Sequence, residues 1–265
     1  MFPWLKKRTL PAQHYETLQT IDSPLRAGSP QLSALAAPKQ KVIFDCDLGG
    51  DVDDAFAVAL LLTSPEFEVL GLVMDHGNTA KRAQVAGRLL YELGLERQIP
   101  IIVGRPTPGI VSQQTGIAGD SHQFIWASGF ERVKPASTNA ATFIIENLRR
   151  YPGEVILFTV GPVCNIQDVV RQDSEALKLA QRVISMFGSF AMGYGGPGTK
   201  PDAEWNVRAD VKAGQALLAS GAKLELAGLD TTTMVKIGVT IQKDELIRRV
   251  MDRYLKQNLM RQPAP

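Results

Sequence analysis

The sequence predicts a doubly wound α/β fold, with a mostly parallel central sheet and helices on both of its faces. Apolar segments alternate along the chain with segments whose apolar residues recur at helical spacing, the pattern of repeated β-α units. Several predicted strands are apolar throughout, as in Val155–Val160, and such strands are typical of a parallel sheet covered on both sides. Hydrophobic residues make up 45% of the 265 residues, which is enough for a large core.

The predicted elements begin at residue 41. Short apolar runs bounded by Gly, Pro, Asn or Asp predict strands at 41–47, 67–75, 99–103, 154–160, 183–190 and 223–229. Apolar residues three and four positions apart predict helices at 52–63, 79–94, 138–150, 165–171, 174–181, 209–219 and 243–257. Two Gly- and Pro-rich stretches, 104–136 and 193–201, predict loops, and the first is long enough to be functional or mobile.

Residues 1–40 differ from the rest of the chain. Pro11, Pro24, Pro30 and Pro38 interrupt any periodic pattern there, so we expect a mobile N-terminal arm followed by a single α/β domain over 41–265. The basic start, Met1–Arg8, is not followed by an apolar segment, so the sequence does not predict a secretory signal.

Charge and cysteine content narrow the class of protein. A net charge of +2 provides no basic surface for nucleic acid. Two cysteines, Cys46 and Cys164, do not make a disulfide framework, and we expect buried thiols in a reducing compartment. No apolar stretch reaches the roughly 20 residues that a membrane span requires. The sequence therefore predicts a cytoplasmic protein that binds neither nucleic acid nor membranes.

Five aspartates lie where the first predicted strand gives way to the first helix. Like charges this close repel, and a buried carboxylate without a partner is costly, so the cluster requires a cation. Oxygen ligands suit a hard cation such as Ca²⁺ or Mg²⁺. The carboxyl edge of the sheet is also where open α/β folds bind their ligands. The five residues are Asp45, Asp47, Asp51, Asp53 and Asp54.

Three further strand ends carry polar groups on the same predicted edge. Asn78 follows the second strand, the turn Gly161-Pro162 follows the fourth, and Glu204 and Asn206 follow the fifth. Because the carboxyl ends of parallel strands share one edge, we expect these groups to converge on the aspartates, as a sugar and a hard metal together would require. Simpler interpretations make Asn78 a turn residue and the pair Glu204 and Asn206 a helix cap.

A phosphatase is a lesser alternative. Phe44–Asp47 fits the strand-end Asp-x-Asp of haloacid-dehalogenase-type phosphatases. Gly49 and the tandem pair Asp53 and Asp54 fit that pattern poorly.

Taken together, these segments resemble the inosine–uridine-preferring nucleoside hydrolase family. The family signature Asp-x-Asp-x-Gly…Asp-Asp-Ala is matched in a longer variant, and the turn after the fourth strand resembles the family's Gly-Pro-Leu-Thr-Asn. A later segment resembles the family's Ala-Glu-Phe-Asn. The matching residues run in family order: Asp45, Asp47, Gly49, Asp53, Asp54, Ala55, Gly77-Asn78, Gly161–Asn165, Ala203–Asn206 and Gly228–Asp230.

The resemblance implies hydrolysis of the N-glycosidic bond of a ribonucleoside to ribose and free base, with one bound Ca²⁺, for which Mg²⁺ is the less suitable substitute. It implies that Asp47 binds the metal and takes a proton from the attacking metal-bound water. Asp54 and the backbone carbonyl of Val160 would be further ligands, and Asp45 would support the ligands from behind. Residues implied to contact the nucleoside are Asp53, Asn78, Glu204 and Asn206, with His122 as a weaker candidate beside the base. The family also suggests a dimer or tetramer.

Two parts of the family pattern have no counterpart in the sequence. The family has an Asn in the loop before its Ala-Glu-Phe-Asn segment, and residues Gly195–Lys200 contain none. The family completes its metal site with a His-Asp pair near its C-terminus, whereas the predicted helix 243–257 leads into Met260–Pro265. A carboxylate from elsewhere, such as Asp75 or Asp230, is a candidate replacement. The alternative is a catalytically impaired relative that binds a nucleoside or a sugar.

Overall fold

The computed structural model of the chain describes residues 38–107 and 122–235, and the fold reported below is that of these residues. Residues 1–37 of the predicted arm and the predicted helix 243–257 lie outside the described residues. Within the described residues, no helix is long and apolar enough to cross a membrane.

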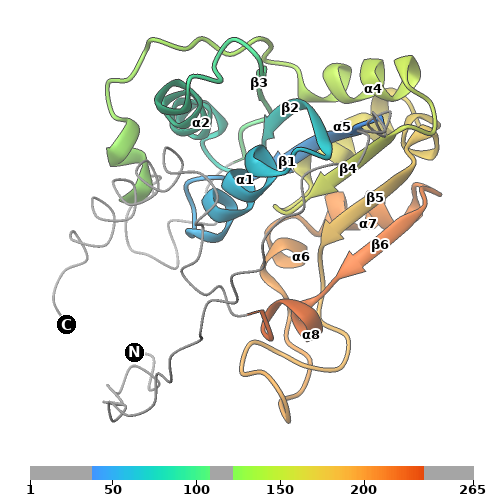
Figure 1. Cartoon of the computed structure of the whole chain (residues 1–265). Coiled ribbons are helices and arrows are strands. Elements are labelled where there is room, and N and C mark those ends of the chain that lie inside the picture. The colour runs from blue at the N-terminus through green and yellow to red at the C-terminus, as the bar shows by residue number, and fades with distance from the viewer. Residues whose placement is uncertain (1–37, 108–121, 236–265) are drawn as a thin grey trace, which may run out of the picture. The chain divides into compact units, whose positions relative to one another are not determined.

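A six-stranded parallel sheet forms the centre of the described chain, with the strand order β3-β2-β1-β4-β5-β6 (Figure 1). This confirms the predicted α/β fold with a parallel sheet. The order reverses direction between β1 and β4, which is the place where doubly wound sheets bind ligands. The strands are β1 (Gln40–Cys46), β2 (Phe67–Met74), β3 (Ile101–Val103), β4 (Val155–Thr159), β5 (Arg182–Met186) and β6 (Leu224–Ala227).

Helices connect consecutive strands, and local signals fix several of their ends. Asn78 caps α2 through a bond from the amide of Lys81, and Gly94 ends it in a left-handed conformation, φ 70°. Asn139 caps α4 in the same way. The helices are α1 (Asp53–Thr63), α2 (Thr79–Leu93), η1 (His122–Ala127), α4 (Ala140–Arg150), α5 (Cys164–Gln172), η2 (Ala176–Leu179), α6 (Trp205–Ala209), α7 (Val211–Ala219) and α8 (Leu229–Thr232), where η denotes a 3₁₀ helix.

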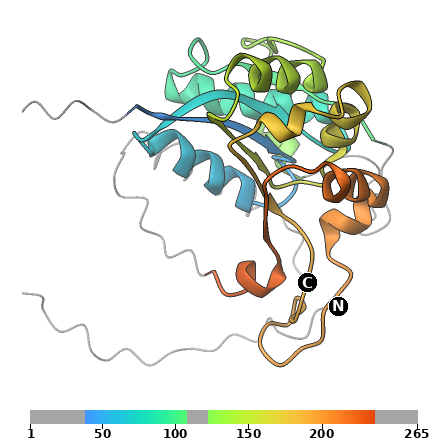
Figure 2. The same ribbon diagram turned by 90° about the vertical axis from the view of Figure 1, so that its right-hand side faces the viewer.

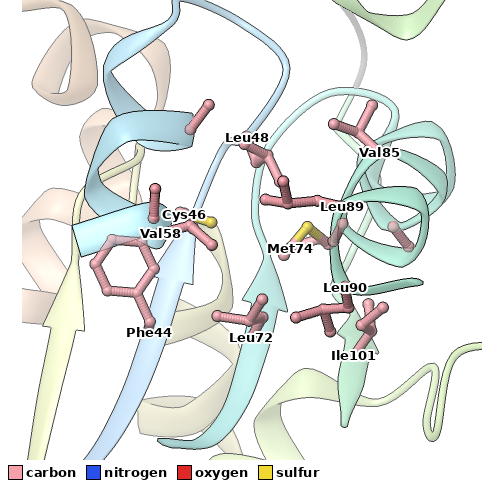
Figure 3. Close-up of a cluster of buried hydrophobic side chains, with 14 of the residues drawn as sticks. Phe44, Cys46, Leu48, Val58, Leu72, Met74, Val85, Leu89, Leu90 and Ile101 are labelled. Atoms are coloured by element: carbon pink, nitrogen blue, oxygen red, sulfur yellow. The ribbon is translucent and has the colours of Figure 1, made fainter. Parts of the chain in front are cut away.

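Two apolar cores lie on opposite faces of the sheet. Alternate residues of β1 point to each face, so that Val42 and Phe44 join one core and Ile43 joins the other. The first core packs α1 and α2 against β1 and β2, as the side chains of Figure 3 show. The second packs α4, α5 and α7 against the other face, and Figure 2 shows α1 and α4 on opposite sides of the sheet. Cys46 and Cys164 are both buried free thiols, as expected.

Several predicted boundaries were wrong. The strand predicted at 183–190 ends at Met186, because the chain turns at Gly188, φ 89°. The strand predicted at 223–229 ends at Ala227 and is followed directly by α8. The helix predicted at 174–181 is only the 3₁₀ helix η2, because Gln181 already pairs with Val155 in the sheet.

Helices also occur at two places where the sequence predicted a loop or predicted neither a helix nor a strand. The stretch 104–136 contains η1, and α6 precedes the predicted helix 209–219, which begins at Val211.

Candidate active site at the carboxyl edge of the sheet

The aspartate loop, residues 47–52, carries the chain from β1 to α1 at the reversal point of the sheet. Its turn depends on Gly49, which has φ 96° and packs under the ring of Phe124. A Cβ on Gly49 would lie 2.9 Å from Phe124 Cε1, so any side chain there would be both strained and obstructed. Gly161 provides a second close approach, because a Cβ on it would lie 3.1 Å from Asp47 Oδ1. The carboxylate of Asp47 is therefore packed against the turn that follows β4.

Asp47 and Asp54 form the central carboxylate pair. Asp54 is 6% exposed, in the first turn of α1, and its carboxyl group lies against that of Asp47. Burial, together with the charges of Asp47 and Asp53, raises the pKa of Asp54 well above its usual value. Two carboxylates in contact favour either a shared proton or a cation between them. The predicted pairing of Asp47 with Asp54 is thus present at the sheet edge.

Asp45 and Asp75 lie behind this pair and are fully buried. Oδ2 of Asp45 accepts a hydrogen bond from Asn165 Nδ2 at 2.8 Å, and Oδ2 of Asp75 accepts one from the amide of Cys164 at 3.1 Å. Burial, and to a smaller extent repulsion from Asp47, raises the pKa of Asp75 to about 6. Within the described residues, Oδ1 of Asp45 and Oδ1 of Asp75 have no hydrogen-bond partner.

Asn206 and Val160 are brought together as the sequence predicted. Asn206 Nδ2 donates to the carbonyl of Val160 at 3.1 Å and to the carbonyl of Met186 at 2.9 Å, so it joins the ends of β4 and β5. A carbonyl oxygen has two lone pairs, and one at Val160 remains available after this bond.

Glu204 is 3% exposed, and both of its carboxylate oxygens accept bonds from backbone amides. Oε1 accepts from Asn206 at 2.8 Å, and Oε2 accepts from Gly188 and Val207, each at 3.1 Å. Glu204 therefore caps α6 and holds the turn after β5, which is the simpler of the two interpretations of its position. Its predicted contact with ribose stays a prediction.

Three predicted substrate residues remain, and two of them, Asn78 and Asp53, are exposed. Asn78 is exposed, and Asn78 Oδ1 accepts the Lys81 amide at 3.1 Å as the cap of α2. Asp53 is exposed at the start of α1, next to Asp54. The backbone of His122 begins η1, and its side chain lies outside what the structure describes.

Neither candidate replacement ligand joins the carboxylate pair. Both oxygens of Asp230 accept backbone amides, from Phe190 at 2.8 Å and from Ala191 at 2.6 Å. In the part of the chain that the structure describes, no three side chains of the types His, Cys, Asp or Glu form a group that could hold a metal ion. Asp75 and Asp230 therefore do not complete a three-carboxylate site with Asp47 and Asp54.

The donors at this edge nevertheless fit a hard cation. They are oxygens only, they include two carboxyl groups in contact, and the buried carboxyl groups behind them have oxygens that lack partners. The family resemblance assigns the ion to Asp47, Asp54 and the Val160 carbonyl, and that assignment stays a prediction.

Three residues that organise the site were not predicted as site residues. Arg82 in α2 is 4% exposed and donates to the carbonyls of Asp47, Leu48 and His76. Gln123 in η1 donates to the carbonyl of Gly50. Asn165 was quoted only as part of a turn motif, and no local pattern marked Arg82 or Gln123.

The fold and this edge define a class: a doubly wound α/β protein with a carboxylate-rich polar site at the carboxyl ends of β1 and β4. The profile of the family described as "Inosine-uridine preferring nucleoside hydrolase" matches residues 42–262. The chain belongs to the inosine-uridine preferring nucleoside hydrolase family, as its motifs predicted, and this membership disfavours the phosphatase alternative.

Individual relatives agree with this membership. The pyrimidine-specific ribonucleoside hydrolase RihB of Escherichia coli is 31% identical over 198 residues, which cover 73% of this chain and 61% of that protein. The plant nucleoside hydrolase PpNRh1 has a TM-score of 0.64 at 24% identity, covering 84% of this chain and 73% of the other. The inosine-uridine preferring nucleoside hydrolase of Bacillus anthracis has a TM-score of 0.61 at 20% identity, covering 83% and 76%. At these identities, the two solved structures show a shared fold.

Proposed function

We propose that the chain hydrolyses the N-glycosidic bond of a ribonucleoside, releasing ribose and the free base. The observation that carries the proposal is the contact between Asp47 and Asp54 at the reversal point of the sheet, beside Gly161, in a chain of the nucleoside hydrolase family. The relative RihB is named for pyrimidine ribonucleosides, so uridine is the first substrate to test and inosine the second.

Hydrolysis requires a general base, negative charge beside the ribosyl centre and departure of the nucleobase. Asp47 takes a proton from a water molecule, and the oxygen of that water forms the new bond to the anomeric carbon. The electron pair of the C–N bond departs with the nucleobase, which is protonated as it leaves. The ribosyl centre acquires positive charge as the base departs, and the carboxylates of Asp47 and Asp54 stabilise that charge. Asp53 and Asn78, both exposed, would bind ribose hydroxyls.

Calcium bound by Asp47, Asp54 and the Val160 carbonyl would supply the charge that lowers the pKa of the attacking water and orients it. The all-oxygen donor set supports Ca²⁺ over a softer metal. The proposed partners are thus a nucleoside and Ca²⁺, and the suggested dimer or tetramer and the cytoplasmic location remain predictions.

The deciding experiment compares three proteins. The unaltered chain, Asp47→Asn and Asp51→Asn are incubated with uridine or inosine in Ca²⁺, and ribose release is followed by a reducing-sugar assay. We expect turnover from the unaltered chain and from Asp51→Asn, whose aspartate is exposed, and a loss of about 10³-fold or more in Asp47→Asn. Circular dichroism checks that each variant is folded. An active Asp47→Asn would show that the base is wrongly assigned.

The same assay distinguishes the proposed hydrolase from a second candidate function, nucleoside binding without turnover. That candidate is favoured by the absence of a third metal-holding carboxylate among residues 38–107 and 122–235. If the unaltered chain binds uridine or ribose in a titration but releases no ribose, the binding function holds and the enzyme function is wrong.

A further inference from the structure

Arg82 is a buried cation inside the aspartate site. Its guanidinium donates through Nε to the carbonyl of His76 at 2.8 Å, and through Nη1 to the carbonyls of Leu48, at 3.0 Å, and of Asp47. Its Nη2 lies 3.7 Å from Oδ2 of Asp47. One side chain on α2 thus holds the aspartate loop and the end of β2 together.

The distances indicate that Arg82 acts mainly on the backbone. The separation to the Asp47 carboxylate is longer than a hydrogen bond, whereas the bonds to Leu48 and His76 have normal hydrogen-bond lengths. The backbone carbonyl of Asp47 faces Arg82 on α2. Oδ1 of the Asp47 carboxylate lies on the side of Gly161. The planar guanidinium with its fixed donors suits several acceptors at once, and the single ammonium of lysine does not.

Residues of η1 close the other side of this arrangement. The Phe124 ring lies 5.7 Å from the guanidinium of Arg82 and covers Gly49, and Gln123 donates to the carbonyl of Gly50. The carbonyls of residues 47, 48 and 50 are therefore all held from the side of α2 and η1.

We propose that Arg82 is the positioning residue of the aspartate loop, holding the loop carbonyls so that the Asp47 carboxylate faces the reaction site. The proposal rests on the proposed function for its kinetic consequence. Arg82 fixes the angle from which Asp47 meets the water and the ribose, so it acts on the rate of the chemical step more than on nucleoside binding. Misplacing a catalytic group by about 1 Å can cost on the order of 10²-fold in rate.

The matched control is Arg88, also in α2. Its guanidinium donates to the carbonyl of Trp126 and lies 4.7 Å from the Trp126 ring, so Arg88→Ala loses the same kinds of contact away from the aspartate loop. The test variants are Arg82→Ala, which opens a space for a small cation, and Arg82→Lys, which keeps the charge and changes the donor geometry.

The first measurement is steady-state kinetics of ribose release. We expect kcat to fall about 10²-fold in both Arg82 variants with KM within about threefold, and little change in Arg88→Ala. Millimolar guanidinium should restore kcat of Arg82→Ala at least about tenfold, and methylammonium at equal ionic strength should not. A merely stabilising role would give no rescue by guanidinium, which weakens protein stability in general. Equal rescue by methylammonium, or full activity in Arg82→Lys, would overturn the proposal.

The second measurement does not depend on activity. Hydrogen exchange followed by mass spectrometry reports the peptide spanning residues 45–56, and we expect it to exchange at least about tenfold faster in Arg82→Lys than in the unaltered chain, with no change in Arg88→Ala. Unchanged exchange would overturn the positioning role. If the unaltered chain releases no ribose, the proposed function has failed, and the exchange result still decides the role of Arg82. Should Arg82→Ala not fold, Arg82→Lys carries both measurements.

Discussion

The side-chain amide of Asn165, in the first turn of α5, donates a 2.8 Å hydrogen bond to Oδ2 of Asp45 at the end of β1. The same nitrogen donates to the carbonyl of Met74 at 3.2 Å, and Oδ1 of Asn165 accepts the amide of Arg105 at 3.3 Å. The side chain of Asn165, which is 1% exposed, therefore joins the ends of β1 and β2 to the segment that follows β3. The buried Asp45 carboxyl is held in this network, and its predicted support of the metal ligands stays a prediction.

Replacing Asn165 by alanine should destabilise the fold. The change leaves the buried Asp45 carboxyl without its donor, and the Met74 carbonyl keeps only the amide of Gly104, at 3.0 Å. The loss costs about 2–3 kcal/mol in the free energy of unfolding. Urea denaturation measures this cost. Asn147→Ala is the control, because Asn147 Nδ2 bonds only within its own helix, to Phe143 at 2.8 Å, and a change within about 0.5 kcal/mol is expected there. Equal effects in the two variants would contradict the network.

Gly161→Ala should impair turnover. The added methyl group would lie 3.1 Å from Oδ1 and 3.2 Å from the amide nitrogen of Asp47, so the aspartate must shift. We expect kcat for ribose release to fall about 10- to 100-fold. Gly50→Ala, in the aspartate loop, is the control. Its added methyl group would lie 3.5 Å from the nearest atoms, an ordinary contact, so this variant should keep most of the activity. An unaffected Gly161→Ala would show that Asp47 is not held by this contact.

The strands were predictable because each depends on a local property, an apolar run bounded by turn residues. Strand ends were less predictable, because they depend on contacts from elsewhere in the chain. The strand predicted to reach residue 190 stops at Met186, and the following amides of Phe190 and Ala191 bond to Asp230 instead of to a neighbouring strand. The sequence near residue 186 does not show that these amides donate to Asp230, which lies 40 positions after Phe190.

The candidate site was predictable where it consists of strand ends and not where helices reach into it. The rule that parallel strands share a carboxyl edge predicted that the aspartates meet the turn after β4, and the family resemblance then singled out Asp47, Asp54 and the Val160 carbonyl. Arg82 does not, because it occupies the same helix as Arg88 and both read as ordinary polar positions; only the packing of α2 against the loop distinguishes them. Glu204 was identified from its motif. Two of its three bonds, from Asn206 and Val207, cap α6, and the third, from the amide of Gly188, holds the turn after β5.

Asp75 should make the stability of the metal-free protein depend on pH. Its pKa is about 6 in the folded chain against 3.8 as the reference value, so the folded state holds a proton that the unfolded state has lost between these values. Stability should therefore fall as pH rises from about 4 to 6, by on the order of 2–3 kcal/mol from this group. The change should be measured by urea denaturation with a chelator present.

Asp75→Asn tests that assignment, because the amide remains neutral and keeps one oxygen for the amide of Cys164. The variant should lose the share of the decline between pH 4 and pH 6 that Asp75 contributes, while Asp54, whose pKa is also raised, keeps its own share. It should be more stable than the unaltered chain at pH 7.5. Asp51→Asn, at an exposed position, should leave the pH profile unchanged. A profile of Asp75→Asn that parallels the unaltered chain would assign the pH dependence to another group.

Calcium should stabilise the folded chain through the pair Asp47 and Asp54. A ligand that binds only the folded state adds about 2.7 kcal/mol at a concentration of 100 times its Kd, and for a domain of this size each kcal/mol raises Tm by about 2–4 °C. Saturating Ca²⁺ should thus raise Tm by roughly 5–10 °C, and Mg²⁺ by less, because Mg²⁺ requires stricter geometry and gives up its water reluctantly.

Asp54→Asn should abolish most of this shift, since it removes one of the two contacting carboxylates, and it should also raise the Tm of the calcium-free protein by relieving their repulsion. The opposite signs of these two effects distinguish a metal ligand from a residue that only packs. A full calcium shift in Asp54→Asn would place the ion at other oxygens. A shift of the same size with Mg²⁺ as with Ca²⁺ would point to screening of the aspartate loop rather than to a shaped calcium site.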